Sequence, residues 1–249
     1  MPVQYADYAQ WHRGYAAAEE QERRNYWQNK LGDLPADRGG ERTPRPSTLM
    51  PVSLPKKVAK NITPFAKREG VTPFMVILNA FQQVLRKERG NEDLVIGTQH
   101  LSRDHEEVRE LIGSFANLIP LRIQLEDPDQ SERLNRIKQT TQEAFAHAMP
   151  YGQLCSHMGQ NSLFDALFIL QGAPSVMKAG GLKLSPYAEG KITELGVDRG
   201  RSLYGIALVL GEGKDGFSGY LEYQTDAYSE TQAGQFFEEM MEILASEVA

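Results

Sequence analysis

Apolar residues recur at helical spacing in several stretches of the chain. The clearest stretch begins after Thr72, a residue type that caps helices, and ends at Gly90, which favours a helix end. Its apolar face consists of Phe74, Ile77, Leu78, Phe81, Val84 and Leu85. The same period predicts helices over residues 2–31, as one long helix or two short ones, over 54–69 and 129–148, and from Ser229 onward.

Between these helices, shorter apolar runs predict strands. They cover residues 93–98, 119–125, 163–171, 203–210 and 217–224, with two more short strands around 182–187 and 191–196. A Gly-rich turn, GEGKDG, separates 203–210 from 217–224 and predicts an antiparallel hairpin. Residues 33–55, rich in proline, predict a surface connector within the same unit. We therefore expect one α/β sandwich over residues 1–249, with helices packed on one face of a mixed, largely antiparallel sheet.

One stretch near the middle of the chain, IGSFANLIPLR at residues 112–122, breaks the apolar pattern. Its Asn117 must find hydrogen-bond partners or face a cavity. Its Pro120 lacks a backbone donor, so the strand that follows belongs at an edge or crossing position. Composition alone favours a structural turn before an interrupted strand.

Composition and charge describe an ordinary globular chain. Of 249 residues, 41% are hydrophobic and 24% are charged, and the net charge is -6. Because Lys and Arg are scattered among Asp and Glu along the sequence, nucleic acid is not expected as a partner. We find no signal-peptide pattern and no apolar run near the roughly 20 residues that a membrane helix needs. We therefore expect no membrane partner and a cytoplasmic location.

The candidate chemistry in the residues is sparse. A single cysteine, Cys155, excludes an intramolecular disulfide and a multi-cysteine metal site, and His157 lies only two residues away, where side chains usually diverge. His100 and Asp104 have the HxxxD form, in which the carboxylate could orient a histidine base. A polar loop after a strand is the simpler interpretation. No phosphate-binding loop, dinucleotide fingerprint, nucleophile elbow or zinc spacing is present.

A series of segments, taken in order, resembles the C-terminal lobe of a condensation domain from a nonribosomal peptide synthetase. They are QYADYAQW, the YW pair with LPADR and RP, VTPFMVILNAFQQVL, DLVIGTQHLSR, IGSFANLIPLR, FAHAMPYGQL, SLFDALFILQ and LEYQTDAYSETQ. Two departures stand out. His147 is followed by Ala148 and Met149 rather than the family's HQxxPFExL-type pattern, and SHMGQN replaces the basic residue expected before SLFDALF.

The resemblance implies a chloramphenicol acetyltransferase-like fold in which two α/β lobes form a V around a tunnel. There the amine of an acceptor aminoacyl thioester attacks a donor thioester, both tethered to phosphopantetheine arms of peptidyl carrier proteins. No permanently bound cofactor is implied, and the wider context is antibiotic or siderophore biosynthesis. The middle stretch would cross to the other lobe as the tunnel floor. The implied floor residues are Gly113, Ser114, Phe115, Asn117 and Arg122.

The catalytic HHxxxDG motif of the family is absent from this sequence. Gln99 and His105 stand where its first His and its Gly would be, so no catalytic residue is assigned and we expect the chain to be inactive alone. Its expected partners are the N-terminal lobe, a carrier protein, and a second copy bound through the exposed inter-lobe surface. Two alternatives remain open: a stand-alone lobe that recruits a carrier protein or partner enzyme, and a homodimeric acyltransferase using His100 or His147. The sequence does not distinguish condensation from epimerisation or cyclisation, and does not identify the amino acids joined.

Overall fold

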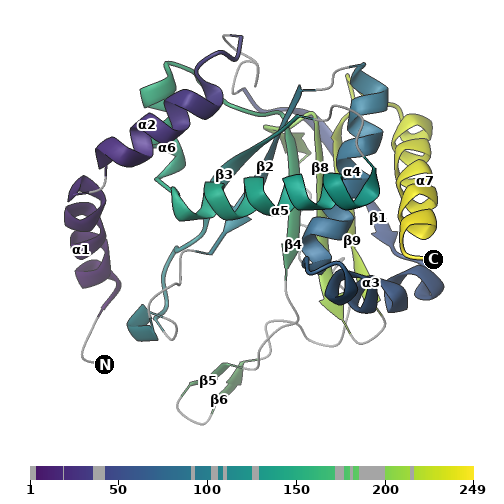
Figure 1. The fold of residues 1–249 in the computed structure, drawn as a ribbon, viewed down its shortest axis with the longest axis horizontal. Helices are drawn as coiled ribbons and strands as arrows, with labels where there is room; N and C mark the ends of the chain where they lie inside the picture. Colours follow the sequence, from purple (N-terminus) through teal and green to yellow (C-terminus); the bar gives the residue numbers. More distant parts are fainter. Residues whose placement is uncertain are drawn as a thin grey trace.

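The computed structural model describes residues 4–18, 20–35, 43–90, 93–101, 106–108, 111–124, 129–171, 177–179, 182–184, 200–213 and 216–249 (Figure 1). The helices are α1 (Tyr5–Ala18), α2 (Glu20–Leu31), α3 (Lys56–Arg68), α4 (Pro73–Arg89), α5 (Gln130–Ala146), α6 (Tyr151–Met158) and α7 (Glu230–Glu247), with a short 3-10 turn, η1 (Glu106–Val108). The strands are β1 (Arg45–Ser53), β2 (Asp93–His100), β3 (Asn117–Gln124), β4 (Ala166–Gln171), β5 (Met177–Ala179), β6 (Leu182–Leu184), β7 (Arg201–Ser202), β8 (Ile206–Gly213) and β9 (Gly216–Gln224).

Seven strands form one mixed sheet in the order β3-β2-β4-β8-β9-β1-β7. The central pairs β2-β4 and β4-β8 are parallel, and all other neighbours in this sheet are antiparallel. Strands β8 and β9 form the predicted hairpin, and β3 lies at the edge, as Pro120 predicts. Strands β5 and β6 pair separately. The predicted mixed, largely antiparallel sheet is confirmed.

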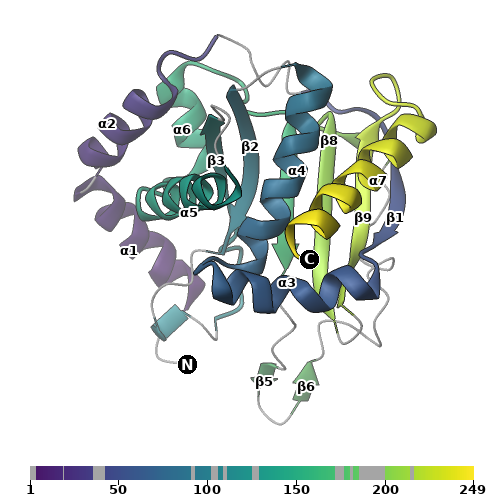
Figure 2. The same cartoon turned by 45° about the vertical axis from the view of Figure 1, so that its right-hand side comes forward.

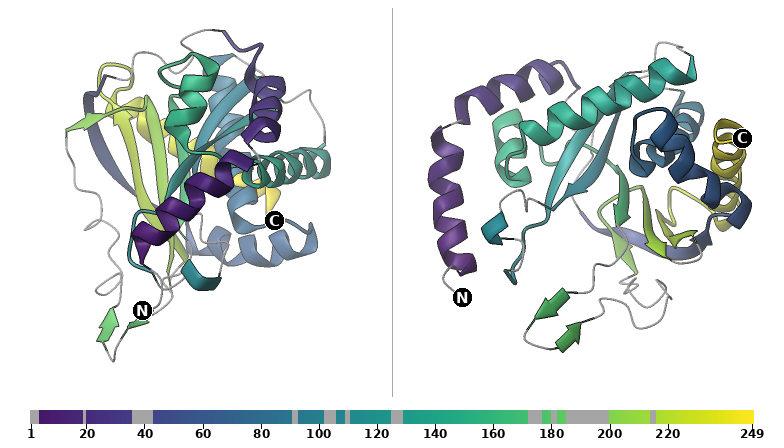
Figure 3. Two further views of the ribbon diagram at one scale, coloured as in Figure 1. Left: turned by 90° about the vertical axis from the view of Figure 1, so that its left-hand side faces the viewer. Right: turned by 60° about the horizontal axis from the view of Figure 1, so that its bottom comes forward.

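Helices α3, α4, α5 and α7 cover one face of this sheet, with α4 in the middle of the layer (Figures 1 and 2). Helix α4 begins where Thr72 accepts a hydrogen bond from the backbone N–H of Met75 at 3.4 Å, and it ends at Gly90 in a left-handed conformation, φ 59°. Helices α1, α2 and α6 lie beside the β3 edge instead (Figure 3). Helices on one face of the sheet are therefore confirmed.

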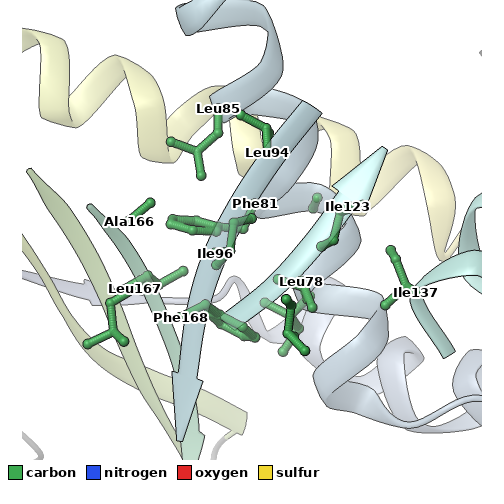
Figure 4. Packing of buried hydrophobic residues seen from close by; sticks show 14 of the residues in the cluster. Leu78, Phe81, Leu85, Leu94, Ile96, Ile123, Ile137, Ala166, Leu167 and Phe168 are labelled. Carbon is green, nitrogen blue, oxygen red and sulfur yellow. The ribbon is translucent and has the colours of Figure 1, made fainter. Parts of the chain in front are cut away.

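The main hydrophobic core lies between α4 and the centre of the sheet (Figure 4). Phe81 of α4 stacks on Phe168 of β4 with ring centroids 5.8 Å apart, and it meets Phe236 of α7 edge-on at 5.6 Å. A second, much smaller cluster lies apart from this core and consists of Tyr8, Val108, Leu111 and Phe115. Helix α1 and the residues before β3 therefore pack around a centre of their own.

Buried polar side chains connect α4 to α7. Asn79 and Gln82 of α4 are fully buried. Asn79 donates to Oε1 of Glu247 at 2.7 Å, and Gln82 donates to Oδ1 of Asn79 at 3.0 Å. Burial raises the pKa of the Glu247 carboxyl. This chain of hydrogen bonds fixes the end of α7 against the middle of α4, because buried amides must find partners.

The prediction of a surface connector over residues 33–55 is wrong for the second half of this range. Residues Arg45–Ser53 form β1, which pairs with β9 over seven registered positions from Ser47↔Gln224 to Ser53↔Ser218. The proline content suggested a loop. However, β7 pairs only with Arg45 and Pro46, so the rest of β1 lies at the edge of the described sheet. An edge strand tolerates a proline such as Pro51.

Other element boundaries differ in smaller ways. The aromatic N-terminal stretch forms two helices, and β4 begins at Ala166 rather than at Leu163. Leu125 and the expected strand around 191–196 lie outside the described residues. Among the described helices, none combines the length and apolar character that a membrane span requires.

The substitution of glycine by alanine should have opposite effects on stability at two positions, Gly97 and Gly234. A Cβ at Gly97 in β2 would lie 2.0 Å from the Phe164 ring, whereas one at Gly234 in α7 meets nothing within 4 Å. We expect Gly97→Ala to lower the free energy of unfolding by about 1–3 kcal/mol through overpacking. Gly234→Ala should raise it by about 0.5–1 kcal/mol, since glycine is costly inside a helix. Urea denaturation of both variants checks this, and equal effects would contradict the packing at Gly97.

Candidate functional site

The predicted floor residues before β3 lie against α1. A Cβ on Gly113 would come within 2.2 Å of the Tyr5 ring, so this position has room only for glycine. The Tyr5 hydroxyl donates to the carbonyl oxygen of Ser114 at 2.8 Å, and its ring meets Phe115 edge-on at 5.2 Å. One tyrosine of α1 thus contacts three consecutive predicted floor residues. Sequence reasoning did not assign Tyr5 to the site, although the QYADYAQW motif marks it.

The side chain of Phe115 anchors this segment. It is 5% exposed and packs on Tyr8 with ring centroids 4.8 Å apart, within the small cluster that includes Val108 and Leu111. The cluster joins η1, the floor residues and α1. The position of the predicted floor residues before β3, which we call the floor segment (residues 112–117), therefore depends on α1 rather than on the main core.

A few large apolar side chains on α1 and in the segments on either side of η1 are exposed, and we call this set the floor surface. It consists of the four large hydrophobic residues that are exposed among the described positions: Tyr5, Trp11, Leu101 and Ile112. Ile112 is 84% exposed, immediately before Gly113. The remaining large apolar side chains in the described part of the chain are at least partly covered, so the exposed ones belong to α1 and the segments beside η1, which favours a binding role there.

Asn117 finds backbone partners. Its amide nitrogen donates to the carbonyl oxygen of Met149 at 2.8 Å, and its oxygen accepts from the backbone N–H of Tyr151 at 3.0 Å. Both groups of the amide therefore hold the turn between α5 and α6 against the start of β3. That Asn117 also faces a reaction tunnel stays a prediction.

Tyr151 continues this connection into the protein. Its hydroxyl oxygen accepts from the N–H of Leu163 at 3.0 Å and lies 3.2 Å from Oγ of Ser162, which donates to the carbonyl oxygen of Phe164 at 2.9 Å. A tyrosine hydroxyl buried among these groups is expected to be a neutral phenol. Burial raises the pKa of Tyr151 to about 12, in agreement with this.

Arg122 lies in a different environment from the floor residues before β3. Its side chain is 10% exposed and donates to the carbonyl oxygen of Lys30 at 2.7 Å and to the carboxylates of Asp93 and Asp33. Hydrogen bonds to Asp93 and Asp33 raise the pKa of the guanidinium above its usual value. The end of α2 is thereby tied to β2 and β3. The predicted role of Arg122 at the floor itself stays a prediction, and the observed role is to hold α2.

The candidate histidines are engaged in packing. Nδ1 of His147 lies 2.8 Å from the carbonyl oxygen of Glu143, and its ring stacks on Tyr26 at 4.1 Å with an angle of 7° between the planes. His100 lies against Phe145, with centroids 4.7 Å apart. Asp104 and His105 lie outside the described residues, so the HxxxD pair stays a prediction.

The only cysteine is not paired with a histidine base. Cys155 is buried on α6. Both ring nitrogens of His157 face Arg24 of α2, with Nδ1 3.1 Å from the guanidinium and Nε2 3.3 Å from the carbonyl oxygen. His157 therefore joins α6 to α2 instead of activating a thiol. Within the described residues, no group of three or more His, Cys, Asp or Glu side chains is placed to hold a metal ion.

The sequence matches the condensation domain family over residues 1–249. The chain belongs to that family. It is 30% identical over 247 residues to a linear gramicidin synthase of Brevibacillus parabrevis and 32% identical over 270 residues to malpibaldin synthetase of Mortierella alpina. These matches cover 90% and 100% of this chain but only 5% of each synthetase. The condensation domain is thus a small part of the relatives that it matches.

Solved structures share the fold. SgcC5 from Streptomyces globisporus superposes with a TM-score of 0.76 at 22% identity, over 99% of this chain and 59% of that one. The first condensation domain of the calcium-dependent antibiotic synthetase, in complex with a substrate analogue, gives 0.74 at 17%, over 96% and 53%. The condensation domain therefore has the expected chloramphenicol acetyltransferase-like fold, and it spans about half to three-fifths of these two chains.

We expect Asn117→Asp to test the role of the Asn117 amide. At neutral pH the carboxylate faces the Met149 carbonyl oxygen and cannot donate, which should cost about 1–3 kcal/mol of unfolding free energy. A protonated carboxyl can donate again, so its pKa in the folded variant is raised above the usual value of about 3.9. The deficit should therefore shrink as the pH falls through that raised pKa and be gone below about pH 4.

The control for this prediction is Asn25→Asp. Asn25 is exposed and accepts from Gln21 through its side-chain oxygen, a role that a carboxylate keeps. Its unfolding free energy should stay within about 0.5 kcal/mol of the parent. Denaturation curves at several pH values give both comparisons. An Asn117→Asp deficit that does not change with pH would contradict the hydrogen bond to Met149.

Replacing Arg122 should release the end of α2. Arg122→Gln leaves Asp93 and Asp33 without their shared cation and should lower the unfolding free energy by about 1–3 kcal/mol. Arg136→Gln, which breaks a surface pair with Glu132, should cost no more than about 0.5 kcal/mol. Trp27 of α2, 1% exposed, is one of the two tryptophans, and its fluorescence reports on α2 when Trp11 is replaced by Phe in both variants. Equal losses in the two variants would show that Arg122 does not secure α2.

Proposed function

We propose that this condensation domain chain acts as the C-terminal, acceptor-side lobe of a nonribosomal peptide synthetase condensation domain. In this role it supplies the acceptor side and the floor of a tunnel that is completed by an N-terminal lobe. The substrates reach the tunnel on the phosphopantetheine arms of carrier proteins. The chain takes part in peptide-bond formation without a catalytic histidine of its own.

The floor surface is the observation that carries this proposal. It exposes Ile112 and Trp11 beside a segment whose own anchor, Phe115, is buried. A segment that is held on one side and apolar on the other suits contact with a second lobe. The matches to solved structures add support, since this chain spans 59% of SgcC5.

The chemistry divides between the two lobes. The acceptor amine nitrogen forms a bond to the donor carbonyl carbon, the carbon–sulfur bond breaks, and the thiol leaves with a proton. A histidine of the HHxxxDG motif, absent here, would assist the amine from the other lobe. This chain would hold the acceptor arm so that the amine lies close to the thioester, which is a contribution of positioning.

Complementation in trans tests the proposal. The chain is mixed with an N-terminal condensation lobe containing HHxxxDG and with donor- and acceptor-loaded carriers, and carrier-bound dipeptide is measured. We expect no dipeptide from the chain alone and dipeptide from the mixture. Ile112→Asp should reduce product at least about tenfold by placing a charge in the apolar contact.

The matched control is Thr231→Asp, which adds the same charge at an exposed position in the first turn of α7. It should leave product formation unchanged, since acidic residues suit a helix N-terminus. Dipeptide formation by the chain alone would overturn the assignment of catalysis to the other lobe. Equal activity of the two variants would remove the floor surface from the contact.

A second candidate function is recruitment of a carrier protein or partner enzyme by the chain on its own. What favours it is the same exposed surface, together with a structural neighbour, the X-domain from teicoplanin biosynthesis, which is solved in complex with OxyB. That neighbour is 20% identical and superposes with a TM-score of 0.73. Titration with carrier domains, with and without the phosphopantetheine arm, separates the two roles. Tight binding without any gain of activity from an N-terminal lobe would favour recruitment.

A further inference from the structure

Helix α3 separates its apolar and basic residues onto different faces. Its buried residues are Ala59, Ile62, Phe65 and Ala66. Its exposed basic residues are Lys56, Lys57, Lys60, Lys67 and Arg68. At 3.6 residues per turn these five cations fall within an arc of about 120°, away from the buried side. Five cations from one helix thus gather on one surface, which we call the basic face.

The basic face has little internal neutralisation. The helix contains no acidic residue. Lys57, Lys60 and Lys67 form no ion pair with any residue in the described part of the chain, and Arg68 pairs only with its neighbour Glu69, at 2.9 Å. Such an exposed pair adds little, and it leaves the face strongly positive.

The position of α3 keeps this face accessible. The helix crosses the lower end of the helical layer, with α4 and β9 on its buried side (Figure 2). Lys138 of α5 donates to the carbonyl oxygen of Gly70 at 2.9 Å, and so brings a sixth cation beside the end of α3. From Lys56 to Arg68 the helix rises about 18 Å, the length of a short helix on another protein.

The charge of the basic face contrasts with the rest of the molecule. The whole chain has a net charge of -6, and α7 of the same layer contains no Lys or Arg. At physiological salt, charges act over about 8 Å, so a ligand at α3 experiences the local cations rather than the net charge. A long polyanion would extend beyond the roughly 18 Å of this helix onto a molecule whose net charge is -6. A compact acidic partner matches its size.

We propose that the basic face of α3 is a docking surface for a protein partner that presents an acidic helix or peptide. Its cations attract and orient this partner, so they act mainly on the association rate. A lipid surface fits less well, because the large hydrophobic residues exposed in the described chain belong to the floor surface and not to α3. The basic face is also separate from the floor surface, so this docking does not depend on the proposed tunnel.

A fluorescein-labelled, glutamate-rich helical peptide is the probe, and fluorescence anisotropy measures its affinity for the full chain. The test variant carries Lys57→Gln, Lys60→Gln and Lys67→Gln, which keep helix propensity. The control carries Arg45→Gln, Lys87→Gln and Arg136→Gln, with the same change in net charge; these residues pair on the surface with Asp226, Glu239 and Glu132.

We expect the test variant to lose at least about tenfold in affinity while the control stays within about twofold of the parent, and we expect the parent to bind more weakly as salt rises. Thermal unfolding of both variants checks that they are folded. Equal loss in both variants, or none in either, would overturn the proposal. So would tighter binding of duplex DNA or of phosphatidylserine-containing vesicles than of the peptide, since these would identify a different kind of partner.

Discussion

Helix α4 is the element that the rest of the fold must cover. Its apolar residues extend around much more than one face, and ten of its residues are buried. A helix of this kind needs packing partners on nearly all sides. The sheet covers one side, and α3, α5 and α7 cover the others. Even the polar positions are used, since Asn79 and Gln82 connect α4 to Glu247 of α7. The exposed faces of the surrounding helices, including the basic face of α3, follow from this arrangement.

The candidate site lies outside that core and is held by three separate connections. Tyr5 holds Gly113 and Ser114, Asn117 holds the turn before α6, and Arg122 holds the end of α2. Each connection joins an element beside the β3 edge to the sheet or to the floor segment. The condensation domain therefore positions the predicted floor residues through polar and aromatic contacts at one edge, and not through the packing that stabilises the sheet.

Hydrophobic period predicted most strands and the helices other than α6, because α3, α4 and α7 each bury one continuous set of apolar residues. It missed α6, where Pro150 and Gly152 favour a break in helical structure. It failed at β1, where prolines resemble a loop although an edge strand tolerates them. The IGSFANLIPLR motif predicted a tunnel floor at residues 112–122, and that role stays a prediction. The partners of Asn117 are backbone groups at Met149 and Tyr151, 32 and 34 positions away. Because every residue has such backbone groups, the sequence does not indicate which ones Asn117 contacts. The basic face of α3, by contrast, follows from the sequence, because residues 54–69 were predicted as a helix and KKVAKNITPFAKR contains five cations.

The small cluster around Phe115 has a consequence for motion. Fixing the backbone of each residue costs about 1–2 kcal/mol. The apolar surface that the four side chains of this cluster bury therefore leaves only a small net free energy for ordering α1 and the floor segment. The main core does not share these contacts, so the unit can open locally while the sheet stays folded. The condensation domain thus combines a stable sheet and helical layer with a peripheral cluster whose opening costs less free energy than unfolding of the core.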